Sequence, residues 1–75
     1  MNLEEFVKGF AEQFDDTDES EITAGTNFRE LDEWSSLISM SLIAYVRTEF
    51  GKKISGNEIR TCETVEDLFN LIESK

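Results

Sequence analysis

Apolar residues recur at helical spacing in three stretches of this chain, and this periodicity constrains the fold more than any other feature. In an amphipathic helix the apolar residues stand three or four positions apart, because they must share one face. The first stretch predicts a helix over residues 2–14, with Asn2 as its N-cap. Its apolar residues are Leu3, Phe6, Val7, Phe10 and Phe14. The chain has no proline and only four glycines, which favours helices over a turn-rich β architecture.

The second stretch predicts a helix that begins at Ser35 or Ser36 and ends at Phe50, with Gly51 as the residue that terminates it. Its core face is expected to carry Leu42, Ile43, Val46 and Phe50. Leu37, Met40 and Ala44 lie on a different flank, about 100° or more around the helix from that face. This flank either packs against the rest of the fold or forms a binding surface, and the pattern leaves both interpretations open.

The third stretch predicts a final helix capped by Thr64, with Asp67 completing a variant of the capping box. Its inward residues are expected to be Val65, Leu68, Phe69 and Ile72. A short helical turn over residues 55–60 precedes it. Between the first two helices, residues 15–35 break the period, and three apolar residues are expected to anchor this long loop: Ile22, Phe28 and Leu31. We therefore expect an all-α fold, a small four-helix bundle with three main helices, one short helix and a long loop between helices one and two.

Acidic residues are concentrated in the N-terminal part of the chain. Residues 1–33 contain eleven acidic and two basic residues, residues 34–75 contain six and five, and the whole chain has a net charge of −10. Such a surface repels nucleic acids and anionic membranes, which are polyanions. It favours basic protein partners or serves only to keep the protein soluble. No signal sequence or long apolar run is visible, so we expect a cytoplasmic protein that does not insert into membranes.

The residue types of the common catalytic and metal sites are missing. The chain has no histidine, which excludes the usual general base, the usual zinc ligand and a Ser–His dyad. Cys62 is the single cysteine, and we expect a buried small side chain rather than a reactive thiol. The acidic run after Phe14 lacks the Gly and Glu that a calcium-binding EF-hand loop requires. Only carboxylates remain for acid–base catalysis, and none is paired in an evident pocket, so an enzyme is disfavoured.

Several short motifs stand in an order that is typical of one family. Residues 28–37 read Phe-Arg-Glu-Leu-Asp-Glu-Trp-Ser-Ser-Leu, and the apolar helix that follows ends in Glu-Phe-Gly at residues 49–51. Ile54, a short helix and Thr-Val-Glu-Asp-Leu at residues 64–68 come next. This order resembles the acyl carrier protein family, in which a Ser-Leu step opens the second helix after a long loop. The resemblance spans nearly the whole chain, so we expect residues 1–75 to form one acyl carrier protein-like domain.

The resemblance implies that Ser36 is the attachment serine, bearing a 4′-phosphopantetheine arm that a phosphopantetheinyl transferase takes from coenzyme A. The thiol at the end of the arm would hold an acyl or aminoacyl group as a thioester, in fatty acid or secondary metabolite biosynthesis. The expected partners are acyl-loading and acyl-transferring enzymes with basic docking surfaces. We further expect Leu37, Met40, Ala44 and Arg47 to form a partner-docking flank next to the attachment serine, on a monomer that is not itself an enzyme. From the residues alone, Ser36 could instead be an N-cap or first helical residue. The chain could also be a small acidic helical interaction or inhibitor module without a prosthetic group.

Two departures from the family pattern indicate a specialised carrier. The usual Asp before the attachment serine is Ser35 here, and the second helix lacks the usual acidic face. Its polar positions include Ser39, Ser41, Arg47 and Thr48. Two aromatic residues have plainer interpretations: Trp34 is expected to anchor the loop to the core or to contact a partner, and Tyr45 is expected to lie on the surface.

Overall fold

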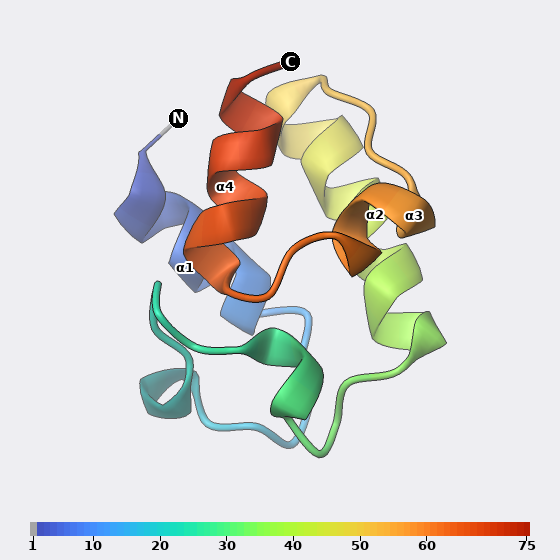
Figure 1. Cartoon of the computed structure of the whole chain (residues 1–75). Coiled ribbons are helices and arrows are strands. Elements are labelled where there is room, and N and C mark those ends of the chain that lie inside the picture. Colours follow the sequence, from blue (N-terminus) through green and yellow to red (C-terminus); the bar gives the residue numbers. More distant parts are fainter. Residues whose placement is uncertain (1) are drawn as a thin grey trace.

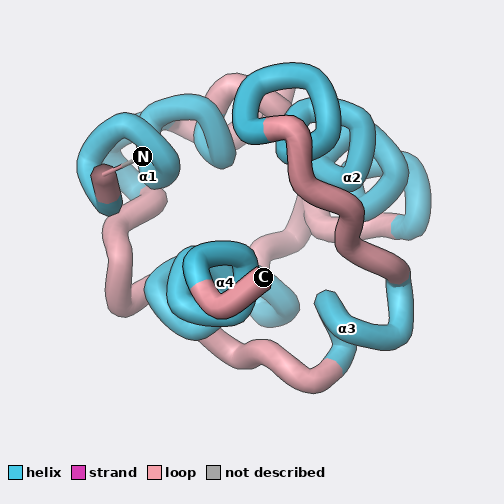
Figure 2. Tube along the Cα trace, turned by 90° about the horizontal axis from the view of Figure 1, so that it is seen from above, coloured by secondary structure: helices cyan, strands magenta, loops and turns pink. Residues whose placement is uncertain are grey.

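The computed structural model describes residues 2–75 and contains four α-helices, with no β-strand among these residues. The helices are α1 (Leu3–Ala11), α2 (Ser36–Phe50), α3 (Gly56–Arg60) and α4 (Val65–Glu73). Seen from above, α4 lies next to α1 and α3 lies next to α2, with α3 and α4 on the same side of the α1–α2 pair (Figures 1 and 2). This architecture confirms the prediction of an all-α bundle with three main helices and one short one.

Each helix begins where a side chain accepts a hydrogen bond from the first turn. The Oδ1 atom of Asn2 accepts from the N–H of Glu5 at 2.8 Å, as predicted. Thr64 and Asp67 form the predicted capping box of α4, and α3 has a second capping box. The helix α2 ends at Gly51, whose φ of 66° lies in the left-handed region that glycine adopts without strain. Local sequence therefore defines most helix boundaries.

The core lies between the helices and is built largely from aromatic and branched aliphatic side chains. The largest fully buried side chains are Phe6, Phe10, Phe28, Leu42, Val46, Ile59, Val65, Leu68 and Ile72. The predicted core face of α2 is confirmed, because Leu42 and Val46 are fully buried and Ile43 and Phe50 pack against the core. Ile38 is also buried, which the predicted stripe on α2 did not include.

The first helix ends earlier than predicted, at Ala11 instead of residue 14. The N–H groups of Gln13 and Phe14 bond to carbonyl groups three residues back, so the chain tightens into a turn after the helix. Phe14 nevertheless remains buried, because this turn keeps its side chain against the core. The apolar spacing thus identifies the three buried phenylalanines but overestimates the length of the helix, and it does not include the buried Gly9 and Ala11.

The prediction that Tyr45 lies on the surface is confirmed only in part. Its ring is half-buried and packs against Phe6 and Phe50, with ring centroids 6.5 and 5.5 Å apart. The residue opposite is Gly9, where a Cβ atom would lie only 1.8 Å from the Tyr45 hydroxyl oxygen. A glycine in the middle of α1 therefore provides the space that the phenol ring occupies.

The loop between α1 and α2 contains two single-turn 3₁₀ helices, η1 (Glu19–Glu21) and η2 (Phe28–Glu30). The predicted anchors are confirmed, since Ile22 and Phe28 are buried and Leu31 packs against the core. An antiparallel bridge joins Asn27 to Thr64, so the loop is also bonded to the residue that caps α4. These contacts hold the loop in place up to the start of α2.

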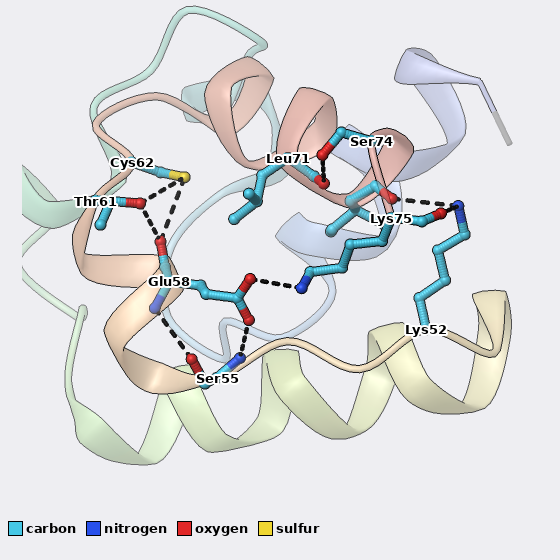
Figure 3. Close-up of polar contacts among 9 residues, drawn as sticks. Lys52, Ser55, Glu58, Thr61, Cys62, Leu71, Ser74 and Lys75 are labelled. Carbon is cyan, nitrogen blue, oxygen red and sulfur yellow. Dashed lines mark hydrogen bonds and ion pairs between the residues drawn. The ribbon is translucent and has the colours of Figure 1, made fainter.

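The opposite end of the bundle is fixed by the segment between α2 and α3 (Figure 3). The Nζ atom of Lys52 donates to the carbonyl oxygens of Ile72 and Lys75 at the end of α4. The Glu58 carboxylate accepts from the Ser55 N–H and pairs with the Lys75 ammonium group. These bonds hold α3 in a defined position relative to α4 and, through the connecting segment, to α2.

Candidate functional site

The first turn of α2 presents two adjacent serines with different roles. Ser35 has extended dihedral angles and is the N-cap, and its Oγ atom accepts from the N–H of Ile38 at 3.4 Å. Ser36 is the first helical residue, and its side chain is exposed without a hydrogen-bond partner among residues 2–75. Ser36 is therefore the first helical residue and not the N-cap, because Ser35 has that role. The Ser36 hydroxyl remains available for chemistry.

Backbone geometry makes this turn suitable for a negatively charged group. The N–H groups of Ser36 and Leu37 have no acceptor among the described residues 2–75. Free N–H groups and the positive end of the helix dipole both favour an anion at a helix N-terminus. No acidic residue occupies the first turn of α2, so this favourable position is not taken by a side chain of the protein itself.

Trp34 positions this turn against the core. Its ring lies 4.7 Å from that of Phe28 and stacks on Phe10, with centroids 6.4 Å apart and ring planes 7° from parallel. The prediction of Trp34 as an anchor between the loop and the core is confirmed. Because Trp34 is two residues before Ser36, its packing fixes the place where α2 begins.

A groove of about 190 Å³ opens beside Ser36. It is lined by Arg29 of η2, by Trp34, Ser35, Ser36 and Ser39 around the start of α2, and by Gly56, Ile59 and Arg60 of α3. In the view of Figure 1, η2 and the first turn of α2 lie below α3. The sequence did not point to Arg29 and Arg60 as site residues, because they are 31 positions apart and belong to no common motif. Only the folded loop brings them together.

The predicted docking residues all lie on the exposed side of α2. Leu37 and Met40 are 71% and 67% exposed, and Ala44 and Arg47 are exposed as well. This excludes the interpretation in which Leu37 and Met40 pack inside the fold. Leu37 and Met40 are three positions apart on one face of α2, so they form a small contiguous apolar patch beside Ser36, and such patches mark candidate partner-binding sites. We refer to these four residues as the α2 flank.

Other reactive or acidic groups have structural surroundings. Cys62 is buried, as predicted, and burial raises the pKa of its thiol. A smaller fraction of the thiol is therefore ionised to the nucleophilic thiolate. A broad acidic depression of about 500 Å³ includes Asp16, Glu21 and Glu33. Among residues 2–75, however, no three His, Cys, Asp or Glu side chains are grouped closely enough to hold a metal ion. Among the described residues, the start of α2 is therefore the best candidate for a functional site.

Comparison with known protein families gives one result. A family whose description reads "phosphopantetheine attachment site" matches residues 5–72, which is most of the chain. Searches of curated proteins and of solved structures returned no match. Within residues 2–75, none of the helices has the length and apolar character needed to cross a bilayer.

Proposed function

This chain belongs to the phosphopantetheine attachment family, and we propose that it is an acyl carrier protein that bears its prosthetic group on Ser36. Members of the family carry 4′-phosphopantetheine and are not enzymes. The single observation that carries the assignment to Ser36 is the difference between the two serines. Ser35 uses its hydroxyl as the cap of α2, whereas the Ser36 hydroxyl is exposed on the first helical residue.

The residues around Ser36 suit the prosthetic group. A phosphodiester on the Ser36 Oγ atom would lie next to N–H groups that have no acceptor among residues 2–75 and next to the positive end of α2. The thiol at the far end of the arm supplies the thioester chemistry that holds an acyl or aminoacyl group. The protein itself contributes an exposed attachment point on a rigid helix and a surface that partner enzymes bind.

The attachment site is tested by an intact-mass time course with a broad-specificity phosphopantetheinyl transferase and coenzyme A. We expect Ser36→Ala to abolish the addition of one phosphopantetheine, and we expect Ser35→Ala to retain it. The Ser35→Ala variant is the matched control, because it removes the neighbouring hydroxyl and only weakens the helix cap, by about 0.5–2 kcal/mol. Modification that survives in Ser36→Ala would overturn the assignment.

Ser35 also bears on how readily the chain is modified. Aspartate is as good an N-cap as serine, and a negative charge at the N-terminus of a helix contributes about 0.3–1 kcal/mol. Because aspartate also restores the residue that the family usually has before the attachment serine, we expect Ser35→Asp to be modified faster than the wild type in the same time course. A slower reaction would mean that the transferase selects an uncharged residue at this position.

We further propose that the α2 flank docks the transferase and the acyl-loading and acyl-transferring enzymes. Its apolar residues begin directly after Ser36, where Leu37 and Met40 are largely exposed. The net negative charge lies mostly outside α2, in residues 1–33, and attracts basic partners to the molecule as a whole. The uncharged residue at position 35 and the lack of an acidic face on α2 favour a specialised pathway over general fatty acid synthesis. We propose a monomer that acts in the cytoplasm.

Met40→Glu tests the docking surface. We expect the variant to keep its helical circular dichroism, because Met40 is exposed, and to be a poorer substrate for the transferase than the wild type. Asn70→Glu on α4 is the control, since it adds the same charge at an exposed position away from the α2 flank. A large loss of helical signal, or equal transfer rates in both variants, would contradict the docking role.

A further inference from the structure

The groove beside Ser36 differs in charge from the rest of the molecule. The chain has a net charge of −10, yet among the described residues the groove is lined by two arginines and by no acidic side chain. Arg29 comes from the loop and Arg60 from the end of α3, so two separate elements each contribute an arginine to the lining of the same groove. A local positive site on an acidic protein attracts anions that the remaining surface repels.

The Arg29 side chain is held in place without being neutralised. Its Nη1 atom donates to the carbonyl oxygen of Arg60 at 3.1 Å, and it has no carboxylate partner among residues 2–75. A guanidinium group has five N–H donors, so most of those on Arg29 remain free. The Arg60 side chain has neither a hydrogen-bond nor an ion-pair partner within the described part of the chain. Arginines with free donors bind phosphate and carboxylate groups in a two-pronged geometry.

We propose that this groove, with Arg29 and Arg60, binds an oxyanion that is itself carried on Ser36. The inference rests on the proposed attachment of the arm to that serine. Ser36 lines the groove, so an oxyanion attached through this serine lies near both arginines. Two oxyanions are candidates. One is the phosphodiester at the base of the arm, and the other is a carboxylate at the end of a short acyl group folded back into the groove.

The size and lining of the groove restrict the cargo that it can hold. Pockets for drug-sized ligands have volumes of about 300–1,000 Å³, and this groove of about 190 Å³ is smaller. Its lining combines the apolar side chains of Trp34 and Ile59 with hydroxyl and guanidinium groups. The apolar part suits a few methylene groups, whereas the polar part loses hydrogen bonds to water when a longer alkyl chain covers it. A short acyl group with a charged end therefore fits the groove better than a long fatty acyl chain.

The experiment compares four forms of the protein by NMR of the arginine Nε–H groups at low ionic strength, where charge interactions are weakly screened. The forms are the unmodified protein, the protein with the bare arm, and the protein loaded from butyryl- and from succinyl-coenzyme A. Intact mass first verifies each addition, so failure of the Ser36 assignment is detected separately from failure of the anion site. Butyryl and succinyl groups both have four carbons and differ in the terminal carboxylate.

If the phosphodiester is the ligand, the Arg29 and Arg60 resonances shift when the bare arm is added, and the cargo has no further effect. If the carboxylate is the ligand, they shift with the succinyl group and not with the butyryl group. Arg60→Gln should abolish the shift at Arg29, whereas Lys53→Gln, which removes a positive charge outside the groove, should leave it unchanged. The proposal is overturned if neither the arm nor the succinyl group shifts these resonances, or if Arg60→Gln leaves the shift at Arg29 intact.

Discussion

Ser35 and Ser36 are chemically identical neighbours to which the backbone gives different tasks. Ser35 is extended, so its Oγ atom turns back to the N–H of Ile38, while Ser36 is already helical and presents its hydroxyl to solvent. A transferase that approaches the start of α2 therefore meets one free hydroxyl and one that is engaged in the cap.

A second residue-scale feature is the contact between Gly9 and Tyr45. We expect Gly9→Ala to lower the free energy of unfolding by about 1–3 kcal/mol, as overpacking of a tight site does, even though alanine favours helix by about 1 kcal/mol. The new Cβ atom would meet the Tyr45 hydroxyl oxygen at 1.8 Å and its ring carbon Cζ at 2.2 Å. Urea unfolding followed by circular dichroism measures the change.

Gly25→Ala is the matched control, because no atom lies within 4 Å of the Cβ position there. Its free energy of unfolding should stay at the wild-type value or rise slightly. In a Tyr45→Ala background, Gly9→Ala should lower the free energy of unfolding much less than it does in the wild type, because the ring that clashes with the new Cβ atom is gone. If Gly9→Ala were as stable as the Gly25→Ala control, the described packing of Tyr45 on α1 would be wrong.

This contact also shows where sequence reasoning ends at the residue scale. The apolar spacing identified the buried phenylalanines of α1 because burial follows the helical period. It could not identify the role of Gly9, since the missing side chain matters only once Tyr45 of α2 lies across from it. Arg29 and Arg60 were missed for the same reason, because their proximity depends on tertiary structure.

Among the elements, the long loop has its start bonded to its end by one acidic side chain. The carboxylate of Glu33 accepts from the N–H groups of Asp15 and Asp16 and from the Thr17 hydroxyl, at 2.7–3.0 Å. The loop start is thereby bonded to the residue directly before Trp34. The Thr17 hydroxyl, together with the two N–H groups, holds the pKa of Glu33 below its ordinary value of 4.5.

Glu33→Gln tests this arrangement through pH. A carboxylate whose pKa is lowered by folding stabilises the native state above its unfolded pKa, and that contribution is lost as the pH falls through the folded value. At pH 7 we expect Glu33→Gln to melt at a lower temperature than wild type, because the amide replaces an acceptor with a donor. The difference in melting temperature should shrink as the pH falls below about 4.5.

Glu30→Gln is the control for this series, since it makes the same change in net charge at an exposed position of η2. Its difference from wild type should be small at pH 7 compared with that of Glu33→Gln. Equal effects of the two substitutions would show that net charge, and not the hydrogen bonds of Glu33, determines the stability of the loop.

At the element scale the sequence predicted the caps better than the helix lengths. Three predicted caps are confirmed, namely Asn2 at the start of α1, Thr64 with Asp67 at the start of α4, and Gly51 at the end of α2. Caps can be predicted because they depend on residues only a few positions apart. The end of α1 was misplaced, since the choice between an α-helical turn and a tighter one after Ala11 depends on how Phe14 packs.

The whole molecule combines a thin core with a strongly uneven charge. A domain of about 60 residues buries only about 60% of the surface of its unfolded chain, and this one is little longer. Nine of its ten net negative charges belong to residues 1–33. These charges repel one another in the compact state, so electrostatics should work against folding.

We therefore expect added sodium chloride, or millimolar magnesium, to raise the melting temperature through screening and diffuse binding. For a domain of 60–100 residues, each kcal/mol of relieved repulsion corresponds to about 4–8 °C. A neutral osmolyte at matched osmolality controls for effects other than charge. A melting temperature that does not respond to either salt would contradict this account.

At this largest scale the fold class and the family could be predicted from the sequence, because they rest on helix order and on motifs spread over the whole chain. The charge of the groove could not be predicted. The C-terminal part has almost balanced charge, and the positive character appears only where Arg29 of the loop folds beside Arg60.

The central claim is that this protein carries a phosphopantetheine arm on Ser36. Its most direct test is mass spectrometry of the intact protein purified from the cell that makes it, with fragmentation to locate any added mass. The account predicts the mass of the chain plus one phosphopantetheine, with or without an acyl group, and places the addition on Ser36. An unmodified chain, or an addition on Ser35 or any other residue, would contradict it.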